Sequence, residues 1–128
     1  MGHEIEKIAK AKGIAIKSII DRSDKTATHK EIDDGSMHNV DVCVDFTNPD
    51  SVINNIIKIS KFNKNIVVGT TGWYNKLDEV KSIVKKGNIG LIYGSNFSIG
   101  VNVFFKIVEN AGKIINKIDN YDVYGYEL

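Results

Sequence analysis

The stretch VVGTTGW, residues 67–73, decides the fold of this 128-residue chain. Two β-branched apolar residues lead into Gly69, two threonines and a second glycine. β-Branched residues favour a buried strand, and glycine lets a main chain approach another group closely. The stretch therefore predicts a strand at Ile66–Val68 whose polar end meets something that requires close backbone approach.

Strand and helix patterns alternate along the chain on both sides of this stretch. Asn48 is suited to cap a helix whose first residue is Pro49, and Gly13 and Gly87 are expected to end two other helices. The patterns predict helices at 2–12, 49–60, 76–85 and from Ser98 onward, and strands at 14–20, 40–46, 66–68, 89–94 and 121–128. Strands separated by helices favour an α/β fold with a parallel sheet and helices on both faces.

Composition limits the kind of protein this is. The chain is 42% hydrophobic and 26% charged, which suits one soluble globular domain, and its net charge of +1 gives no reason to expect nucleic acid or a membrane as partner. Cys43 lies in an apolar run and is expected to be a small buried hydrophobe. No stretch reaches the roughly 20 apolar residues of a spanning helix, and the N-terminus is too charged for a signal peptide, so we expect a cytoplasmic protein.

Polar residues follow four of the predicted strands. They are Asp21, the pair Phe46-Thr47, the run Gly69-Thr70-Thr71 and the run Ser95-Asn96-Phe97. The carboxyl ends of parallel strands lie at one edge of a sheet, and ligands of such sheets bind there. The four stretches together predict a binding crevice.

The position of Asp21 indicates what the crevice would bind. A carboxylate at the end of the second strand of a dinucleotide-binding fold accepts hydrogen bonds from the adenosine ribose, about 20 residues after the glycine turn. Asp21 follows Gly2 by 19 residues, and Arg22 is placed to stack on adenine or to meet a 2′-phosphate. A solvated Asp-Arg pair in a turn remains the alternative. Only Met1 and Gly2 precede the first helix, so the first strand and its glycine turn are missing from this sequence.

Three segments together resemble the bacterial 4-hydroxy-tetrahydrodipicolinate reductase family, also called dihydrodipicolinate reductase. They are VDFTNPDSV (44–52), VVGTTGW (67–73) and YGSNFSIGVNVFFKIV (93–108). The resemblance implies a Rossmann-like domain at 1–120 without its first strand, followed at 121–128 by the start of a substrate domain. In that family the chain continues into a His-His pair and a lysine that serve catalysis, and these would lie beyond Leu128. Homoserine and aspartate dehydrogenases fit less well, because they do not account for the SNFSIGVN segment.

The resemblance also implies a role for each predicted site residue. Gly2 would face the pyrophosphate, Asp21 and Arg22 would hold the adenosine half, and Thr71 would in addition touch a substrate carboxylate. The remaining residues would line the nicotinamide groove: Phe46, Thr47, Gly69, Thr70, Thr71, Ser95, Asn96 and Phe97. The cofactor would be NADH or NADPH, the substrate a cyclic dicarboxylate, and the family's homotetramer would require the C-terminal domain.

Several residues that often carry chemistry are not assigned any here. His3, His29, His38 and Cys43 lack metal-ligand spacing, and no residue is a credible general acid. Phe104 and Phe105 are expected to be core residues of the long helix. Two functional alternatives stay open: the cofactor-binding part of a reductase, or a non-catalytic nucleotide-binding module or gene remnant. Without its innermost strand, the domain is expected to be marginally stable, prone to aggregate and weak in cofactor affinity.

Overall fold

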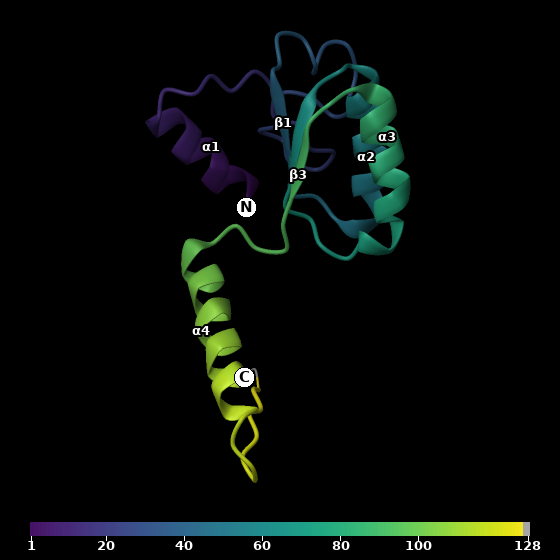
Figure 1. Ribbon diagram of the computed structural model, residues 1–128. Helices are drawn as coiled ribbons and strands as arrows, with labels where there is room; N and C mark the ends of the chain where they lie inside the picture. Colours follow the sequence, from purple (N-terminus) through teal and green to yellow (C-terminus); the bar gives the residue numbers. More distant parts are fainter. Residues whose placement is uncertain (127–128) are drawn as a thin grey trace. The chain divides into compact units, whose positions relative to one another are not determined.

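The computed structural model describes residues 1–126 and divides into two compact units. The first unit, Met1–Ser95, contains α1 (Gly2–Ala11), β1 (Val42–Asp45), α2 (Pro49–Lys61), β2 (Asn65–Val68), the 3-10 helix η1 (Tyr74–Lys76), α3 (Leu77–Gly87) and β3 (Leu91–Tyr93). The second unit begins at Asn96 and contains α4 (Ile99–Ile115). Figure 1 shows these elements along the chain.

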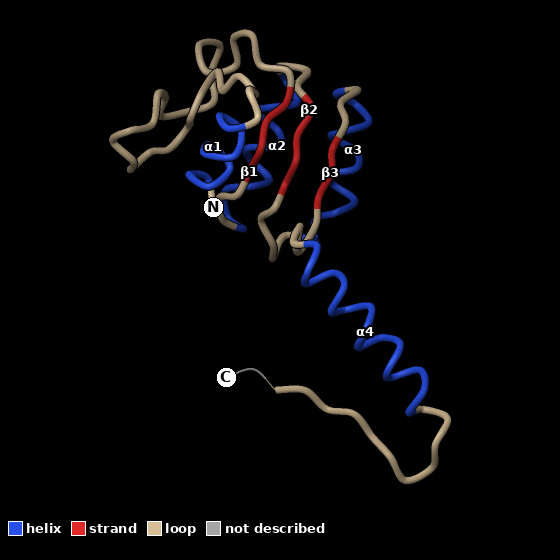
Figure 2. The backbone as a smooth tube through the Cα atoms, turned by 90° about the vertical axis from the view of Figure 1, so that its left-hand side faces the viewer, coloured by secondary structure: helices blue, strands red, loops and turns tan. Residues whose placement is uncertain are grey.

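The three strands form one parallel sheet in the order β1-β2-β3 (Figure 2). Cys43 lies opposite Ile66, and Ile66 lies opposite Leu91, so the three strands run in step. The predicted α/β fold with a parallel sheet is confirmed, with shorter strands than the patterns at 40–46 and 89–94 suggested. All three strands therefore present their carboxyl ends at the same edge.

The hydrophobic core lies between one face of the sheet and helices α2 and α3. Helix α2 begins as predicted, because the Asn48 side chain accepts a hydrogen bond from the Ser51 amide and Pro49 occupies the first turn. Its apolar stripe packs on β2, and the most deeply buried side chains of this cluster are Val52, Ile56, Ile66, Val68, Trp73 and Val80. This packing fixes where the loops after β1 and β2 begin.

The opposite face of the sheet is apolar and exposed. Val44, Val67 and Ile92 lie side by side on it in register, and Val44 and Ile92 are 50% and 63% exposed. Helix α1 lies on this side of the sheet in Figure 1 but contains no buried residue. Helices thus lie on both sides of the sheet, while only the α2 and α3 side is densely packed.

The predicted strand at Ile14–Ile20 is wrong. Only an isolated parallel bridge between Ile20 and His29 forms there, with the His29 amide donating to the Ile19 carbonyl at 3.0 Å. No strand among the described residues runs beside this β-branched segment, so its main chain has no ladder to join. Asp21 therefore does not follow a strand of the sheet.

Three predictions near the other helices also need correction. Gly87 is the last residue of α3, and Asn88 caps the helix in the left-handed conformation at φ +48°. No strand forms at 121–126, where no described segment pairs with the chain, and residues 127–128 lie outside the described residues. Phe104 and Phe105 are 60% and 54% exposed, because the described part of the second unit holds no other regular element to cover α4.

Of two further predictions, one is confirmed and the other is not tested by the structure. Gly13 ends α1 in the left-handed conformation as expected, at φ +68°. The predicted domain boundary at residue 120 stays a prediction. Among the described residues, no helix has the length and apolar character needed to cross a bilayer.

Candidate functional site

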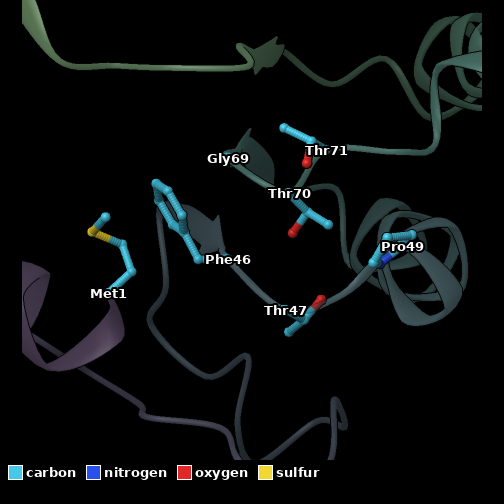
Figure 3. A pocket seen from close by; sticks show the side chains of 7 residues that line it. All are labelled: Met1, Phe46, Thr47, Pro49, Gly69, Thr70 and Thr71. Atoms are coloured by element: carbon cyan, nitrogen blue, oxygen red, sulfur yellow. The ribbon is translucent and has the colours of Figure 1, made fainter. Parts of the chain in front are cut away.

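A pocket of about 240 Å³ lies at the carboxyl ends of β1 and β2. Its lining residues are Met1, Phe46, Thr47, Pro49, Gly69, Thr70 and Thr71. Figure 3 shows Met1 and Phe46 toward one side of this pocket and Pro49 toward the other. Five of the predicted site residues are thus brought together: Phe46, Thr47, Gly69, Thr70 and Thr71.

The approach of Gly69 to Phe46 sets the shape of the pocket. A Cβ atom built on Gly69 would overlap the Phe46 ring, with Cδ1 at 2.6 Å and Cε1 and Cζ closer still. Any residue other than glycine would force the ring to move. The close backbone approach predicted from the sequence is therefore, in this structure, an approach to an aromatic ring.

Trp73, on the core side of the pocket, anchors the loop that follows β2. The fully buried indole donates from Nε1 to the Thr70 carbonyl oxygen at 2.7 Å, and Gly72 takes a left-handed turn at φ +83° against Pro49. Trp73 also makes edge-on ring contacts with Tyr74 and Tyr93. These contacts fix the position of the Gly69–Thr71 main chain relative to the hydrophobic core.

A buried carboxylate lies under the pocket, and the sequence analysis did not identify it. Asp45, 5% exposed, accepts from the Thr47 amide at 2.8 Å, the Thr47 hydroxyl at 2.7 Å and the Thr70 hydroxyl at 3.3 Å. Its other oxygen accepts from the Asn55 amide group at 2.9 Å. The signal was present, because Asp45 shares a strand face with Cys43, which was expected to be buried.

The start of α1 lies close to both the pocket and the Asp21 turn. Met1 caps α1 and lines the pocket, and Gly2 is the first helical residue. The His3 side chain reaches Asp24 of the turn, with Nε2 at 3.1 Å from the carboxylate. Asp21 and Arg22 do not line the pocket, but this contact links their turn to the end of α1 nearest the pocket.

Asp21 is exposed and organises its own turn. One carboxylate oxygen accepts from the Asp24 amide at 2.8 Å and from the Ser23 amide and hydroxyl at 2.8 and 2.9 Å. The Asp24 amide, followed by the Ser23 groups, lowers the pKa of the Asp21 carboxyl group below its usual value. The second oxygen takes none of these three bonds.

The last predicted stretch is divided between the two units. Ser95 follows β3 in the first unit and does not line the pocket. Asn96 belongs to the second unit, where its side chain accepts from the Ser98 amide at 2.7 Å just before α4. Phe97 lines a shallow apolar groove along α4 with Ile99 and Val103.

The remaining candidate groups have local roles. Cys43 is half-buried beside Met37, and burial raises the pKa of its thiol to about 11. The His29 ring contacts the Thr28 hydroxyl at 2.9 Å, and the His38 ring contacts the Asn39 amide group at 3.1 Å. Within the described residues, no three His, Cys, Asp or Glu side chains are grouped as metal ligands would be.

Residues 1–97 match the protein family described as "Dihydrodipicolinate reductase, N-terminus". This chain belongs to the dihydrodipicolinate reductase family. The matched range includes every residue that lines the pocket as well as Asp21 and Arg22. The family resemblance stated from the sequence is confirmed.

Curated relatives agree with the dihydrodipicolinate reductase assignment. A protein of Methanococcus aeolicus named "4-hydroxy-tetrahydrodipicolinate reductase" is 44% identical over 89 residues, which is 69% of this chain and 32% of the relative. Proteins of the same name from Christiangramia forsetii and Buchnera aphidicola are 32% and 39% identical over 96% and 67% of this chain, and over 49% and 32% of their own lengths. The chain thus spans about a third to a half of the length of these relatives.

Proposed function

We propose that this chain supplies the nicotinamide dinucleotide-binding part of a 4-hydroxy-tetrahydrodipicolinate reductase. The whole protein would reduce 4-hydroxy-tetrahydrodipicolinate to tetrahydrodipicolinate with NADH or NADPH, in the cytoplasmic synthesis of diaminopimelate and lysine. The observation that supports this most directly is the pocket formed by the Phe46-Thr47 and Gly69-Thr70-Thr71 loops at the carboxyl edge of a parallel sheet.

The pocket residues fit a nicotinamide group. Because Gly69 has no side chain, the Phe46 ring lies close to the main chain at the pocket wall, and an aromatic ring is a group that a planar nicotinamide packs against. Thr71 adds a hydroxyl group at the pocket wall for a carboxamide or a carboxylate, and the Thr47 hydroxyl, which donates to Asp45, can accept from a carboxamide NH2 group. A volume near 240 Å³ is below the range of about 300–1,000 Å³ typical of complete ligand sites, so the pocket suits one end of a dinucleotide.

The rest of a dinucleotide would extend along the start of α1. Unpaired amide groups and the dipole at a helix N-terminus favour a pyrophosphate, and Gly2 has open space where a side chain would stand. The Asp21 turn, joined to α1 through His3 and Asp24, would then receive the adenosine ribose. When bound, the reduced nicotinamide supplies a hydride, while the residues of this chain bind and orient it.

Calorimetric titration of the chain with NADH and NADPH tests the binding proposal. We expect both nucleotides to bind weakly, and Asp21→Ala to weaken both. Arg22→Ala should weaken NADPH more than NADH if the guanidinium meets the 2′-phosphate, whereas Lys25→Ala is the matched control in the same turn. No detectable binding of either nucleotide to the folded chain would reject the proposal.

The activity belongs to the protein as the genome encodes it. Sequencing the DNA on both sides of this reading frame, followed by a reduced-nicotinamide absorbance assay with the dicarboxylate substrate, tests the reductase proposal. Substrate-dependent oxidation of the nucleotide supports it. Stop codons at both ends together with nucleotide binding but no turnover would favour the non-catalytic module instead.

A further inference from the structure

The carboxylate of Asp45 connects three separate segments beneath the pocket. It accepts hydrogen bonds from Thr47 in the loop after β1, from Thr70 in the loop after β2 and from Asn55 in α2. The Asp45 carbonyl oxygen also accepts from the Gly69 amide at 2.8 Å. Two of these partners, Thr47 and Thr70, line the pocket itself.

We propose that Asp45 is the positioning residue of this pocket. Its carboxylate fixes the two threonine loops relative to each other and thereby sets the affinity for the nicotinamide end of the cofactor. Asp45 does not line the pocket, so it would act through Thr47 and Thr70 rather than by touching the ligand. The proposal deepens the proposed function and rests on it for the identity of the ligand.

Burial and geometry make the carboxylate difficult to replace. Every side-chain bond at Asp45 is one that its oxygens accept, and the side chain is almost completely buried. Thr70 is itself buried, so removing the acceptor would leave its hydroxyl without the carboxylate partner that it has here. An asparagine at this position has a single acceptor oxygen, whereas the donors of Thr47 and Thr70 bond one oxygen of Asp45 and the Asn55 amide group bonds the other.

A role in stability alone predicts something different. If Asp45 only supported the sheet, its loss would lower the melting temperature while folded molecules kept their affinity. If Asp45 positions the loops, folded molecules of the variant bind more weakly, and the amide groups of the two loops exchange with solvent faster. Measurements well below the melting temperature separate the two possibilities.

The test compares Asp45→Asn with Asp41→Asn in the full chain. Asp41 is exposed and directly precedes the other end of the same strand, so it provides the same chemical change away from the pocket. NMR hydrogen exchange at the Phe46–Thr47 and Gly69–Thr71 amides reports loop order without ligand, and calorimetry reports NADH and NADPH affinity. We expect faster loop exchange and about tenfold weaker binding for Asp45→Asn only, since binding would then have to reorder the loops at a cost of about one hydrogen bond to a charged group.

Each outcome decides the proposal. Unchanged loop exchange in folded Asp45→Asn overturns it, as does faster exchange with unchanged affinity. If Asp45→Asn does not fold, Asn55→Ala removes one partner from outside the pocket and should give smaller changes in the same direction. If that folded variant matches the wild type, the proposal is rejected. Failure of the wild-type chain to bind either nucleotide rejects the proposed function and the nucleotide role of Asp45, while loop exchange still shows separately whether Asp45 holds the loops.

Discussion

At the scale of single residues, the pocket depends on a glycine, Gly69, and on a buried carboxylate, Asp45. Gly69 leaves room for the Phe46 ring, and Asp45 receives hydrogen bonds from the loops above it. The pocket residues were predictable because glycine and threonine at strand ends have a recognisable pattern. Asp45 was missed because a single acidic residue at the end of an apolar run resembles an ordinary strand terminus.

Substitution of Gly69 by alanine is expected to disrupt the pocket. The new methyl group would displace the Phe46 ring, and such overpacking typically lowers the free energy of unfolding by about 1–3 kcal/mol. Gly112→Ala is the control, because a Cβ there meets nothing within 4 Å and alanine favours a helix interior. Urea denaturation should show a loss for Gly69→Ala alone; equal midpoints for that variant and the wild type would contradict the assigned close packing.

The Cys43 thiol should resist modification at neutral pH. Burial raises its pKa from 9.0 to about 11, so the neutral thiol is the favoured form in the folded state. The corresponding contribution to stability is fully present below pH 9 and is lost as pH rises toward 11. We expect the rate of reaction with Ellman's reagent to rise at a higher pH in the folded chain than in the chain unfolded by urea. Identical pH profiles in the two states would show that Cys43 is not buried.

At the scale of elements, local signals predicted the helices better than the strands. The Asn48 cap and Pro49 fixed the start of α2, because helix hydrogen bonds form between residues close in sequence. The β-branched segment 14–20 has equally strong local signals, yet it stays out of the sheet. A strand requires a neighbour, and the presence of that neighbour cannot be read from the segment itself.

The Asn48 cap should contribute measurably to stability. Asn48→Ala removes the acceptor for the Ser51 amide and is expected to lower the free energy of unfolding by about 1 kcal/mol. Asn48→Asp keeps the acceptor and should remain close to the wild type. Asn54→Ala, an exposed position in the same helix, controls for the change in side chain. A loss for Asn54→Ala as large as that for Asn48→Ala would argue against the cap.

At the scale of the whole molecule, only one face of the sheet is densely packed in the part of the chain that the structure describes. The core beneath α2 and α3 was predictable from helical and strand periodicity. The exposure of Val44 and Ile92 on the other face was not, because an alternating pattern shows which residues share a face but not what covers it. Within residues 1–126, β2 is the only strand that pairs with β1, and an apolar face beside such an edge is a surface through which copies of the chain can associate.

Lysine substitutions on this face are expected to reduce self-association. Val44→Lys and Ile92→Lys place charges on residues that are already half exposed or more, so they should cost little stability. Sedimentation velocity should show less oligomer and aggregate than in the wild type. Ile14→Lys changes an exposed apolar residue outside the sheet and should leave association unchanged. If all three variants associate like the wild type, this face is not the contact surface.

The indole of Trp73 has a practical consequence. It is the only tryptophan in the chain, and its ring nitrogen is bonded to the carbonyl of a residue that lines the pocket. Its fluorescence emission therefore comes from one known place, directly beneath the loop that a ligand would contact. Reduced nicotinamide absorbs light at the wavelengths that tryptophan emits, so its arrival would quench this emission by energy transfer. If the pocket binds the proposed cofactor, this emission reports its occupancy, and ligand screening would need no added label.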